Sequence, residues 1–454
     1  MIKNISRVLV MVFTCAFAKA YAQTAPVPVL SKDAAVTQML ANNFGIKLAA
    51  NDVSIAENNS DILNSGYLPS VTGNAGATFD RSSSETDFNG ALNQNGEPRP
   101  NVEINDAETN RYNASINVSY TLFDGLGRYY TYKELKERYN LSQLQARQTI
   151  ENTMLQLFSV YYEVARLEEN ISVLKEALKI SKERVTRATY QFQYGQVNKL
   201  EILNAEVDIT TDSINVLNAQ QQLRNAQRDL NVVLARDITD LKTADTTVTF
   251  TNALQIEKYI LEAPDNNVTL LQNESDIEIS NYQIKGAKSF ILPTIGLTGS
   301  YGWNLANNPA SAFFPGTTNT SNNLALGANL TWNLFDGGRS LIGLRNAKIA
   351  LDSRELVRNQ LEQQVQRDIA NAAGNYRNAL TIYNLQTQNV LTNEANFTRS
   401  EERFKIGQVT SIEFRQAQLN LLNAKTTKNA AKYTAKLAEL QLLQLTGQLL
   451  NVNF

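Results

Sequence analysis

Two hydrophobic patterns divide this chain: a period of two in four short stretches and a period of seven in two long ones. In each short stretch, apolar or small residues alternate with Asn, Thr, Ser and Gly, and the apolar positions include Tyr120, Tyr301, Trp303 and Trp332. A period of two predicts β-strands with one apolar and one polar face. The expected strand pairs are about 68–80 with 111–123 and about 292–304 with 323–335, with polar loops at 81–111 and 305–323.

The polar strand faces leave two interpretations open. Strands of this kind are usually half-buried in a soluble sheet. Aromatic residues near the strand ends, opposite a face of Asn, Thr, Ser and Gly, instead favour a membrane β-barrel with a wet interior. No later apolar run approaches the length of a transmembrane helix, so we expect any membrane insertion to use strands.

The two long stretches, about 125–190 and 338–403, contain no proline and are predicted to be helices. At 1.5 Å per residue each would reach roughly 95–100 Å. Apolar residues recur every seven positions, which is the seam of a coiled coil. The seam residues are Ile150, Leu157, Val164, Ile171, Leu178 and Val185 in the first stretch and Ile369, Tyr376, Tyr383, Val390 and Phe397 in the second.

Short signatures show that the chain is internally duplicated. Leu-Phe-Asp-Gly at 122–125 returns at 334–337, and Phe-x-x-Gly-Gln-Val at 192–197 returns at 404–409, both 212 residues later. A constant offset indicates two copies of one long element of fixed length. The predicted organisation is a leader at 1–22, a first repeat at 23–235, an equatorial connector at 236–264 and a second repeat at 265–454.

Each repeat is expected to read helix, strand, loop, strand, long helix, turn and returning helix. The helices before the strands lie at about 32–64 and 266–289, the tips at 191–199 and 404–411, and the returning helices at about 199–235 and 411–446. The connector, which is rich in Asp and Thr, is expected to have mixed structure.

The first signature lies where a strand passes into a long helix, at Phe123-Asp124-Gly125 and Phe335-Asp336-Gly337. An Asp here can accept hydrogen bonds from the free N–H groups of the first turn, and Gly tolerates the sharp bend. No partner base or metal ligand accompanies either Asp. We therefore predict structural rather than catalytic roles for them.

The second signature ends each long helix, at Gly195-Gln196-Val197 and Gly407-Gln408-Val409. Gly permits the positive φ that ends a helix, so each site predicts a hairpin tip. Glu201 and Glu413 both lie six residues after the glycine. Their carboxylates either stabilise the first turn through the helix dipole or form a polar ring around an aperture, and the sequence leaves both interpretations open.

Composition excludes several classes of function. Residues 1–22 are typical of a secretory signal, with Lys3 and Arg7 before an apolar stretch and a cleavage site at Ala20-Tyr21-Ala22. Cleavage would remove Cys15 and leave a chain without cysteine or histidine, with a net charge of −5 (−2 less the three cations of the leader). A lipoprotein signal at Cys15 is disfavoured, because small residues do not precede it. Nucleic-acid binding, thiol chemistry, histidine-based catalysis and a cofactor are not expected.

Together, the leader, the two strand pairs, the Leu-Phe-Asp-Gly junctions and the Phe-x-x-Gly tips resemble the TolC family of outer-membrane efflux proteins over about 32–447. The resemblance implies an α-helical and membrane β-barrel fold. In a homotrimer, four strands per chain would close a twelve-stranded barrel, and antiparallel coiled-coil helices would form a periplasmic tunnel. Four strands alone cannot close a barrel, so oligomerisation is also expected on physical grounds.

The family also suggests roles for the tip residues. Its acidic ring at the closed entrance corresponds to Glu201 and Glu413, while Gln416 stands where the family has a second acidic residue. A Tyr and an Arg that lock the family's entrance are replaced here by Phe404 and Val409, so we expect closure to rest on packing. The tip residues Gly195, Gln196, Val197, Gly407, Gln408 and Val409 are candidate contacts for a periplasmic adaptor (membrane fusion) protein.

The implied function is that of a passive, non-enzymatic channel in the outer membrane of a Gram-negative bacterium, with most of the chain in the periplasm. It would complete a tripartite efflux pump or a type I secretion system. The expected partners are two further copies of the chain, outer-membrane lipid, an adaptor, and an inner-membrane RND or ABC transporter reached through the adaptor. The alternative is a non-conducting coiled-coil tether with a membrane foot; an envelope enzyme is disfavoured.

Overall fold

The computed structural model describes residues 29–452, so the predicted leader lies outside the described residues. Contacts divide the chain into two compact units. Among the described residues, unit 1 comprises 29–52, 143–272 and 358–452, and unit 2 comprises 53–142 and 273–357. Each unit therefore contains segments of both sequence repeats.

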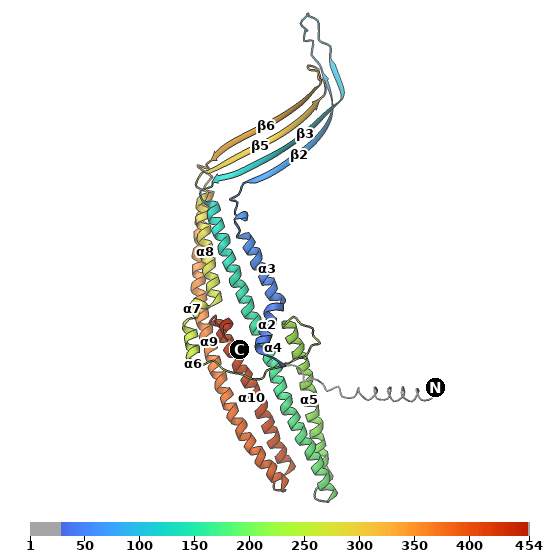
Figure 1. Cartoon of the computed structure of the whole chain (residues 1–454), viewed down its shortest axis with the longest axis vertical. Helices are drawn as coiled ribbons and strands as arrows, with labels where there is room; N and C mark the ends of the chain where they lie inside the picture. The colour runs from blue at the N-terminus through green and yellow to red at the C-terminus, as the bar shows by residue number, and fades with distance from the viewer. Residues whose placement is uncertain (1–28, 453–454) are drawn as a thin grey trace, which may run out of the picture. The chain divides into compact units, whose positions relative to one another are not determined.

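Unit 2 contains a four-stranded antiparallel sheet in the order β2-β3-β5-β6 (Figure 1). The strands are β2 (Ser70–Thr86), β3 (Val102–Phe123), β5 (Thr294–Asn308) and β6 (Thr317–Thr331). Strands β2 and β6 form its two edges. The central pair, β3 with β5, joins a strand from the first repeat to one from the second.

The sheet register places the apolar positions of all four strands on one face. Residues directly opposite each other on antiparallel strands share a face. Ile116 pairs with Gly73 on one side and Tyr301 on the other, and Tyr301 pairs with Leu324. The next polar row contains Thr72, Asn117 and Ser300. The apolar and polar residues that alternate along the four strands thus form one apolar face and one polar face of the sheet.

The strands are longer than the hydrophobic alternation predicted, and the loops are correspondingly shorter. Pairing continues to Thr86 opposite Val102 and to Asn308 opposite Thr317. Most side chains in these extensions are polar, and the few apolar ones (Val102, Ile104, Ala107, Leu305 and Ala306) do not continue the regular alternation of the strand cores. The hydrophobic pattern was therefore too weak to predict strands there. The main-chain ladder satisfies the backbone regardless of side-chain type. At its other end β6 stops at Thr331, short of the predicted 335.

Two pairs of long helices carry the chain to its hairpin tips (Figure 1). Helix α4 (Gly127–Gln193) is followed by α5 (Lys199–Val233), and α9 (Arg339–Lys405) by α10 (Ser411–Leu445). Both long helices have 67 residues and both returning helices have 35, so the two hairpins match in length. No described helix is both long and apolar enough to cross a bilayer.

Shorter elements complete the two units. Residues 32–64, expected as one helix, form α2 (Lys32–Asn42) and α3 (Phe44–Asn59), followed by a 3₁₀ turn at Ile62–Asn64. The connector contributes β4 (Thr243–Ala244), α6 (Ala253–Leu261) and α7 (Ala263–Asn266), and α8 (Val268–Ser289) follows. Strand β4 pairs in parallel with β1 (Val29–Leu30), and a second 3₁₀ turn lies at Leu449–Asn451.

The core of unit 1 is built around aromatic residues of α4. Tyr162 stacks on Phe158 at 5.7 Å and lies 5.6 Å from the ring of Tyr433 on α10. The hydroxyl of Tyr161 donates to Leu30 O at 2.6 Å and accepts from the backbone N–H of Asp245 at 2.8 Å. One buried phenol therefore ties both strands of the small parallel pair to the long helix.

The buried stripe of α4 changes position as the helix approaches its tip. Leu157, Val164 and Ile171 are buried, as expected of seam residues. Beyond them Leu178 and Val185 are half-buried. The buried positions there are Ala177, Ser181, Arg184 and Ala188. Near the tip of α4, small and polar side chains therefore occupy the most buried positions, and the predicted seam residues lie beside them.

Candidate functional site at the hairpin tips

Both long helices end in the same kind of turn. At the first tip, the N–H of Gln196 donates to Gln191 O at 2.8 Å and that of Gly195 to Phe192 O at 2.9 Å. At the second tip, Gln408 and Gly407 repeat these bonds to Arg403 and Phe404. This pair of bonds defines a Schellman turn, in which the glycine adopts a positive φ. The φ angles are 73° at Gly195 and 75° at Gly407.

The two returning helices begin differently. Thr410, before α10, forms a reciprocal capping box: its backbone N–H donates to Glu413 Oε2 at 2.8 Å, and the N–H of Glu413 donates to Thr410 Oγ1 at 3.2 Å. Asn198, at the equivalent position before α5, makes no side-chain cap bond. The hydrogen bonds from Thr410 hold the pKa of the Glu413 carboxyl below its usual range. The Glu413 carboxylate is thus engaged within its own helix start.

The remaining predicted polar residues are dispersed. Glu201 lies half-buried in the first turn of α5. The Gln416 amide donates to Asn420 Oδ1 at 2.8 Å, along the surface of α10. Glu413 and Gln416 therefore bond to residues of the second hairpin, and within the single chain the structure does not bring Glu201 to them.

Phe404 belongs to an aromatic stack inside the second hairpin. The Phe404 ring lies parallel to the Phe414 ring, with 4.7 Å between the ring centroids. The Phe397 ring lies 5.5 Å from the Phe414 ring. The Arg187 guanidinium of α4 lies 5.2 Å from the Phe404 ring and donates to the backbone carbonyl of Lys405. A cation–π contact and a hydrogen bond thus join the two hairpins at this level.

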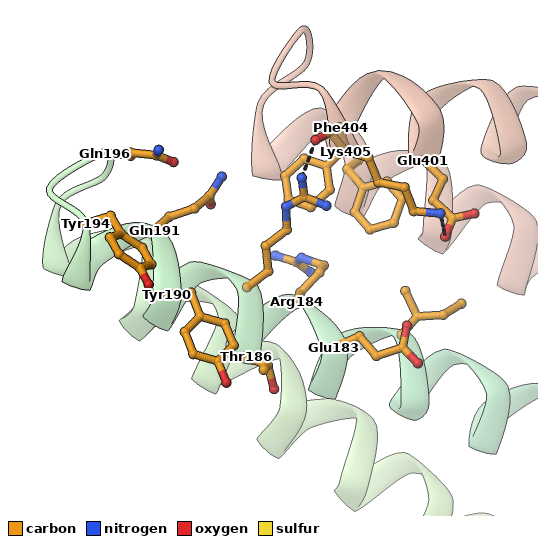
Figure 2. A pocket seen from close by; sticks show the side chains of 13 residues that line it. Glu183, Arg184, Thr186, Tyr190, Gln191, Tyr194, Gln196, Glu401, Phe404 and Lys405 are labelled. Atoms are coloured by element: carbon orange, nitrogen blue, oxygen red, sulfur yellow. Dashed lines mark hydrogen bonds and ion pairs between the residues drawn. The ribbon is translucent and has the colours of Figure 1, made fainter.

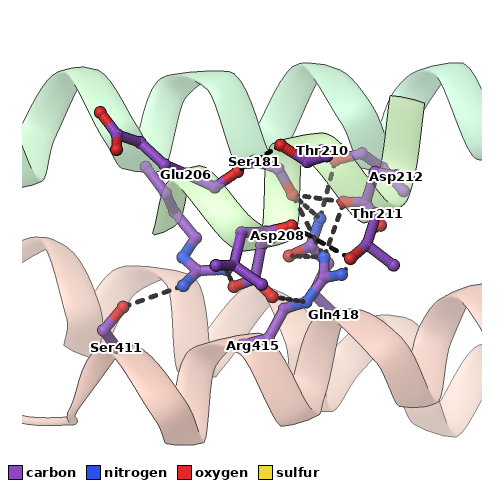
Figure 3. A network of polar contacts seen from close by, with 12 residues as sticks. Ser181, Glu206, Asp208, Thr210, Thr211, Asp212, Ser411, Arg415 and Gln418 are labelled. Carbon is purple, nitrogen blue, oxygen red and sulfur yellow. Dashed lines mark hydrogen bonds and ion pairs between the residues drawn. The ribbon is translucent and has the colours of Figure 1, made fainter. Parts of the chain in front are cut away.

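A buried polar network, which we call the clasp, joins the two hairpins further from the tip glycines (Figure 3). Arg415 on α10 forms a bidentate pair with Asp212 on α5, through two N–O contacts of 2.8 Å. Arg184 on α4 donates to Asp208 at 2.8 Å and to Ser411 Oγ at 3.0 Å. The clasp therefore contains residues of three helices and both repeats.

Two uncharged side chains complete the clasp. Ser181 donates to Asp212 Oδ2 at 2.6 Å, and Gln418 donates to Ala177 O at 2.8 Å. Ser181, Asp212 and Gln418 are almost inaccessible to solvent. Charges buried in this way are costly to leave unpaired, so their mutual pairing fixes how the two hairpins pack.

The clasp was not among the sites predicted from the sequence, although the distances of some of its residues from the tip glycines contain a signal. Arg184 lies 11 residues before Gly195, Asp208 lies 13 after it, and Arg415 lies 8 after Gly407. In antiparallel hairpins, residues at similar distances from the turn lie at similar heights. Opposite charges at similar heights could therefore have indicated the contacts of Asp208 with Arg184 and Arg415. The bidentate pair of Arg415 with Asp212, which lies 17 residues after Gly195, gives no such match.

An open groove of about 550 Å³ lies between the two hairpins beside the tips (Figure 2). Tyr190, Tyr194 and Gln196 line it from the first hairpin, and Phe404 and Lys405 from the second. Of the residues predicted from sequence, Gln196 and Phe404 thus meet in one groove. The half-buried Val197 and Val409 do not line it.

The strand-to-helix junctions show how the long helices begin. Asp124 Oδ2 accepts from the N–H of Arg128 at 2.9 Å, and Asp336 Oδ2 accepts from the N–H of Ser340 at 2.9 Å. Gly125 and Gly337 have φ values of 69° and 72°. Phe123 is the last residue of β3, whereas Phe335 lies beyond β6 and is highly exposed.

Comparisons with known proteins agree over most of the chain. The sequence model described as outer membrane efflux protein matches residues 35–236 and 260–448. Outer membrane protein TolC of Salmonella enteritidis is 22% identical over 357 residues, covering 76% of this chain and 71% of the relative. Outer membrane efflux protein BepC of Brucella suis is 20% identical over 415 residues, covering 91% and 85%.

A solved structure shows the same fold. The Campylobacter jejuni CmeC outer membrane channel superposes with a TM-score of 0.71 at 20% sequence identity, covering 92% of this chain and 85% of that one.

Proposed function

This chain belongs to the outer membrane efflux protein family, and from that premise we propose that it is the passive outer-membrane channel of a tripartite efflux pump or type I secretion system. The family is one of channel proteins rather than enzymes. The observation that carries the proposal is the family match across both repeats, combined with a sheet that has one apolar and one polar face. Such a sheet suits lipid on one side and water on the other.

The sheet of one chain requires partners to function in a membrane. Strands β2 and β6 are edges within the described chain, and unpaired backbone groups are very costly in hydrocarbon. Pairing β6 of one copy with β2 of the next satisfies both edges. In the proposed homotrimer, three four-stranded sheets close a barrel of twelve strands, and the helices of the three copies form a periplasmic tunnel.

An apolar seam on α5 supports oligomerisation independently of the sheet. Leu200, Leu203, Val207, Ile214 and Leu217 are all exposed in the single chain. Their spacings of 3, 4, 7 and 3 residues are those of a coiled-coil seam that faces a partner helix. We assign this seam to contact with a neighbouring copy.

The tips form the periplasmic end of the proposed channel. Gly195, Gln196, Val197, Gly407, Gln408 and Val409 are the proposed contacts for an adaptor protein, through which an inner-membrane RND or ABC transporter supplies energy. The groove beside Gln196 and Phe404 offers aromatic and charged groups to such a partner. Glu201, Glu413 and Gln416 are proposed to face the aperture.

Gating is then a shift between packed arrangements of the two hairpins, biased by the adaptor. Phe404 and Val409 replace the Tyr and Arg of the family's lock. Stacking of Phe404 on Phe414 supports closure by packing, and the clasp adds buried ion pairs between the two hairpins. Separating the hairpins would expose or unpair these groups, which opposes opening.

Reconstitution of the purified protein tests this proposal. We expect a trimer in detergent by light scattering and discrete conductance steps in planar bilayers. Phe404→Ala should increase conductance by weakening the aromatic stack. A monomer in detergent, or bilayers that stay silent, would contradict the proposal.

The tether hypothesis gives the opposite result in the same experiment. A non-conducting structural protein would also form an oligomer with long helices. It would show no conductance before or after Phe404→Ala. The polar sheet face favours the channel, because a solid foot would have no water to solvate it.

A further inference from the structure

A chain of ring and cation contacts leads from the apolar sheet face onto the start of α4. Tyr120 lies on the apolar face, in register with Leu297 of β5. The Arg128 guanidinium lies 6.0 Å from the Tyr120 ring and 5.3 Å from the Tyr67 ring. Tyr67 meets Tyr132 edge to face at 6.3 Å. The Lys136 amino group lies 4.7 Å from the Tyr132 ring.

The cluster contains two cations of different availability. The Arg128 side chain is mostly covered: it bonds to Asp124 Oδ2 at 3.1 Å and to Gly66 O at 3.0 Å. Lys136 is exposed. Its amino group lies over the Tyr132 ring. Tyr132 is five residues, and therefore about 8 Å along the helix axis, from Gly127, the first residue of α4. This height matches the polar headgroup layer beside the hydrocarbon core of a bilayer, which is roughly 5–8 Å thick.

We propose that Lys136, held over Tyr132, binds the phosphate headgroup of an anionic phospholipid in the inner leaflet of the outer membrane, and that Tyr67 and Arg128 continue this contact to the apolar sheet face. This inference rests on the proposed membrane location of the sheet. Lys and Tyr are the side chains that place an apolar stem in the interface and a polar end in the headgroup layer. Because the ring contacts continue to Tyr120, the acyl chains can lie on the apolar sheet face while the phosphate lies at Lys136. This arrangement favours a lipid over free phosphate.

The second repeat lacks this arrangement and provides a matched control. Positions 212 residues after Tyr120, Arg128, Tyr132 and Lys136 hold Trp332, Ser340, Leu344 and Lys348. The Trp332 indole donates to Ile291 O at 3.1 Å, so an uncharged pair lies at that junction. Lys348 is exposed like Lys136 but has Leu344 where Lys136 has Tyr132.

Lipid titration of the detergent-solubilised full-length protein tests the proposal. Short-chain phosphatidylglycerol below its micellar concentration should raise the midpoint of thermal unfolding in a saturable way, from which an apparent Kd follows. Lys136→Ala should raise this Kd about fivefold through loss of one cation near phosphate. Tyr132→Leu, which keeps the charge, should raise it about threefold. Lys348→Ala should change it less than twofold.

Four results would overturn the inference. An equal rise of the Kd in Lys136→Ala and Lys348→Ala would indicate general attraction between the protein's positive charges and the lipid. Stabilisation by inorganic phosphate at the same concentration would indicate an anion site without lipid. Loss of the oligomer in Lys136→Ala would indicate that another copy covers the cluster. Bilayer conductance of the same variants distinguishes the lipid-site hypothesis from the channel hypothesis. If Lys136→Ala conducts normally and its lipid affinity is unchanged, the lipid site is refuted and the channel proposal is not.

Discussion

Asp212 has 3% of its side chain exposed and pairs with two nitrogens of one guanidinium. At such a site the cost of losing a partner exceeds the value of the contact itself, because the remaining charge is left in a poorly solvated environment. The clasp is thus both a packing determinant and a point of vulnerability. Surface ion pairs in the same unit, such as that of Arg358 with Glu362, lack this property.

Replacement of Asp212 should therefore destabilise the paired hairpins. We expect Asp212→Ala to lower the free energy of unfolding by about 3 kcal/mol, because Arg415 loses its bidentate partner. Arg358→Ala should cost less than about 0.5 kcal/mol, since both members of that pair are exposed. Denaturant titration checks both values. Equal effects of the two substitutions would show that the clasp is not specially stabilising.

Glu168 should make stability depend on pH. Burial raises the pKa of its carboxyl to about 7, although Oε2 accepts the N–H of Ala244 at 3.3 Å. A raised folded-state pKa means that the folded protein binds more protons than the unfolded chain between about pH 4.5 and 7. The contribution of this group is therefore fully present below pH 4.5 and is lost as pH rises through 7.

Glu168→Gln provides the measurement for this residue. From pH 5 to pH 8 the free energy of unfolding should fall by about 1–2 kcal/mol less in the glutamine variant than in the parent. This difference is smaller than the whole pKa shift would give, because the carboxyl is partly exposed to solvent. Thermal unfolding at several pH values checks this. Parallel pH profiles for the two proteins would show that Glu168 ionises normally.

At the scale of elements, the two hairpins have equal lengths but unequal helix starts. Thr410 closes a capping box with Glu413, whereas Asn198 makes no side-chain cap bond. Both residues lie three positions after the tip glycine. The first turn of α10 is thus better stabilised than that of α5, and the two hairpins present tips of different local stability.

Alanine substitution at these equivalent positions should separate the two starts. Thr410→Ala should destabilise the beginning of α10 by about 1 kcal/mol through loss of the cap. Asn198→Ala should destabilise the beginning of α5 by only a few tenths of that free energy. Amide hydrogen exchange in the first turns of both helices reports each effect locally. A larger effect at Asn198 would mean that its side chain caps α5 in solution.

At the scale of the whole molecule, the single chain leaves an exposed apolar seam that we propose another copy covers. The α5 seam includes Val207, which is 65% exposed. Burial of each large aliphatic side chain stabilises an interface by about 1.5–3 kcal/mol. An amphipathic helix with such a seam exposed to water would favour association.

Val207→Lys should weaken the proposed trimer by placing a charge in its interface. We expect the dissociation constant to rise at least tenfold, measured by analytical ultracentrifugation in detergent. Glu206→Lys adds the same side chain about 100° around the helix and should have little effect. If Glu206→Lys dissociates the oligomer and Val207→Lys does not, the seam faces solvent instead.

The sequence by itself predicted the elements, because their signals are local. Alternation over nine residues specified each strand core, and the repeated Gly-Gln-Val at 195–197 and 407–409 marked where long helices turn. The family resemblance followed from the order and spacing of the same features. The full strand lengths were not predictable, since pairing of Thr86 with Val102 involves backbone groups common to all residues.

Only the tertiary structure decided how the two repeats combine. Pairing of β3 with β5 joins them in the sheet, and the clasp of Arg415 with Asp212 joins them near the tips. In the clasp, the two paired residues are 203 positions apart in the sequence. A charged residue that points into an interface has the same local pattern as one that points into water. Its burial depends on which helices pack together, and that information lies in the fold rather than in any single segment.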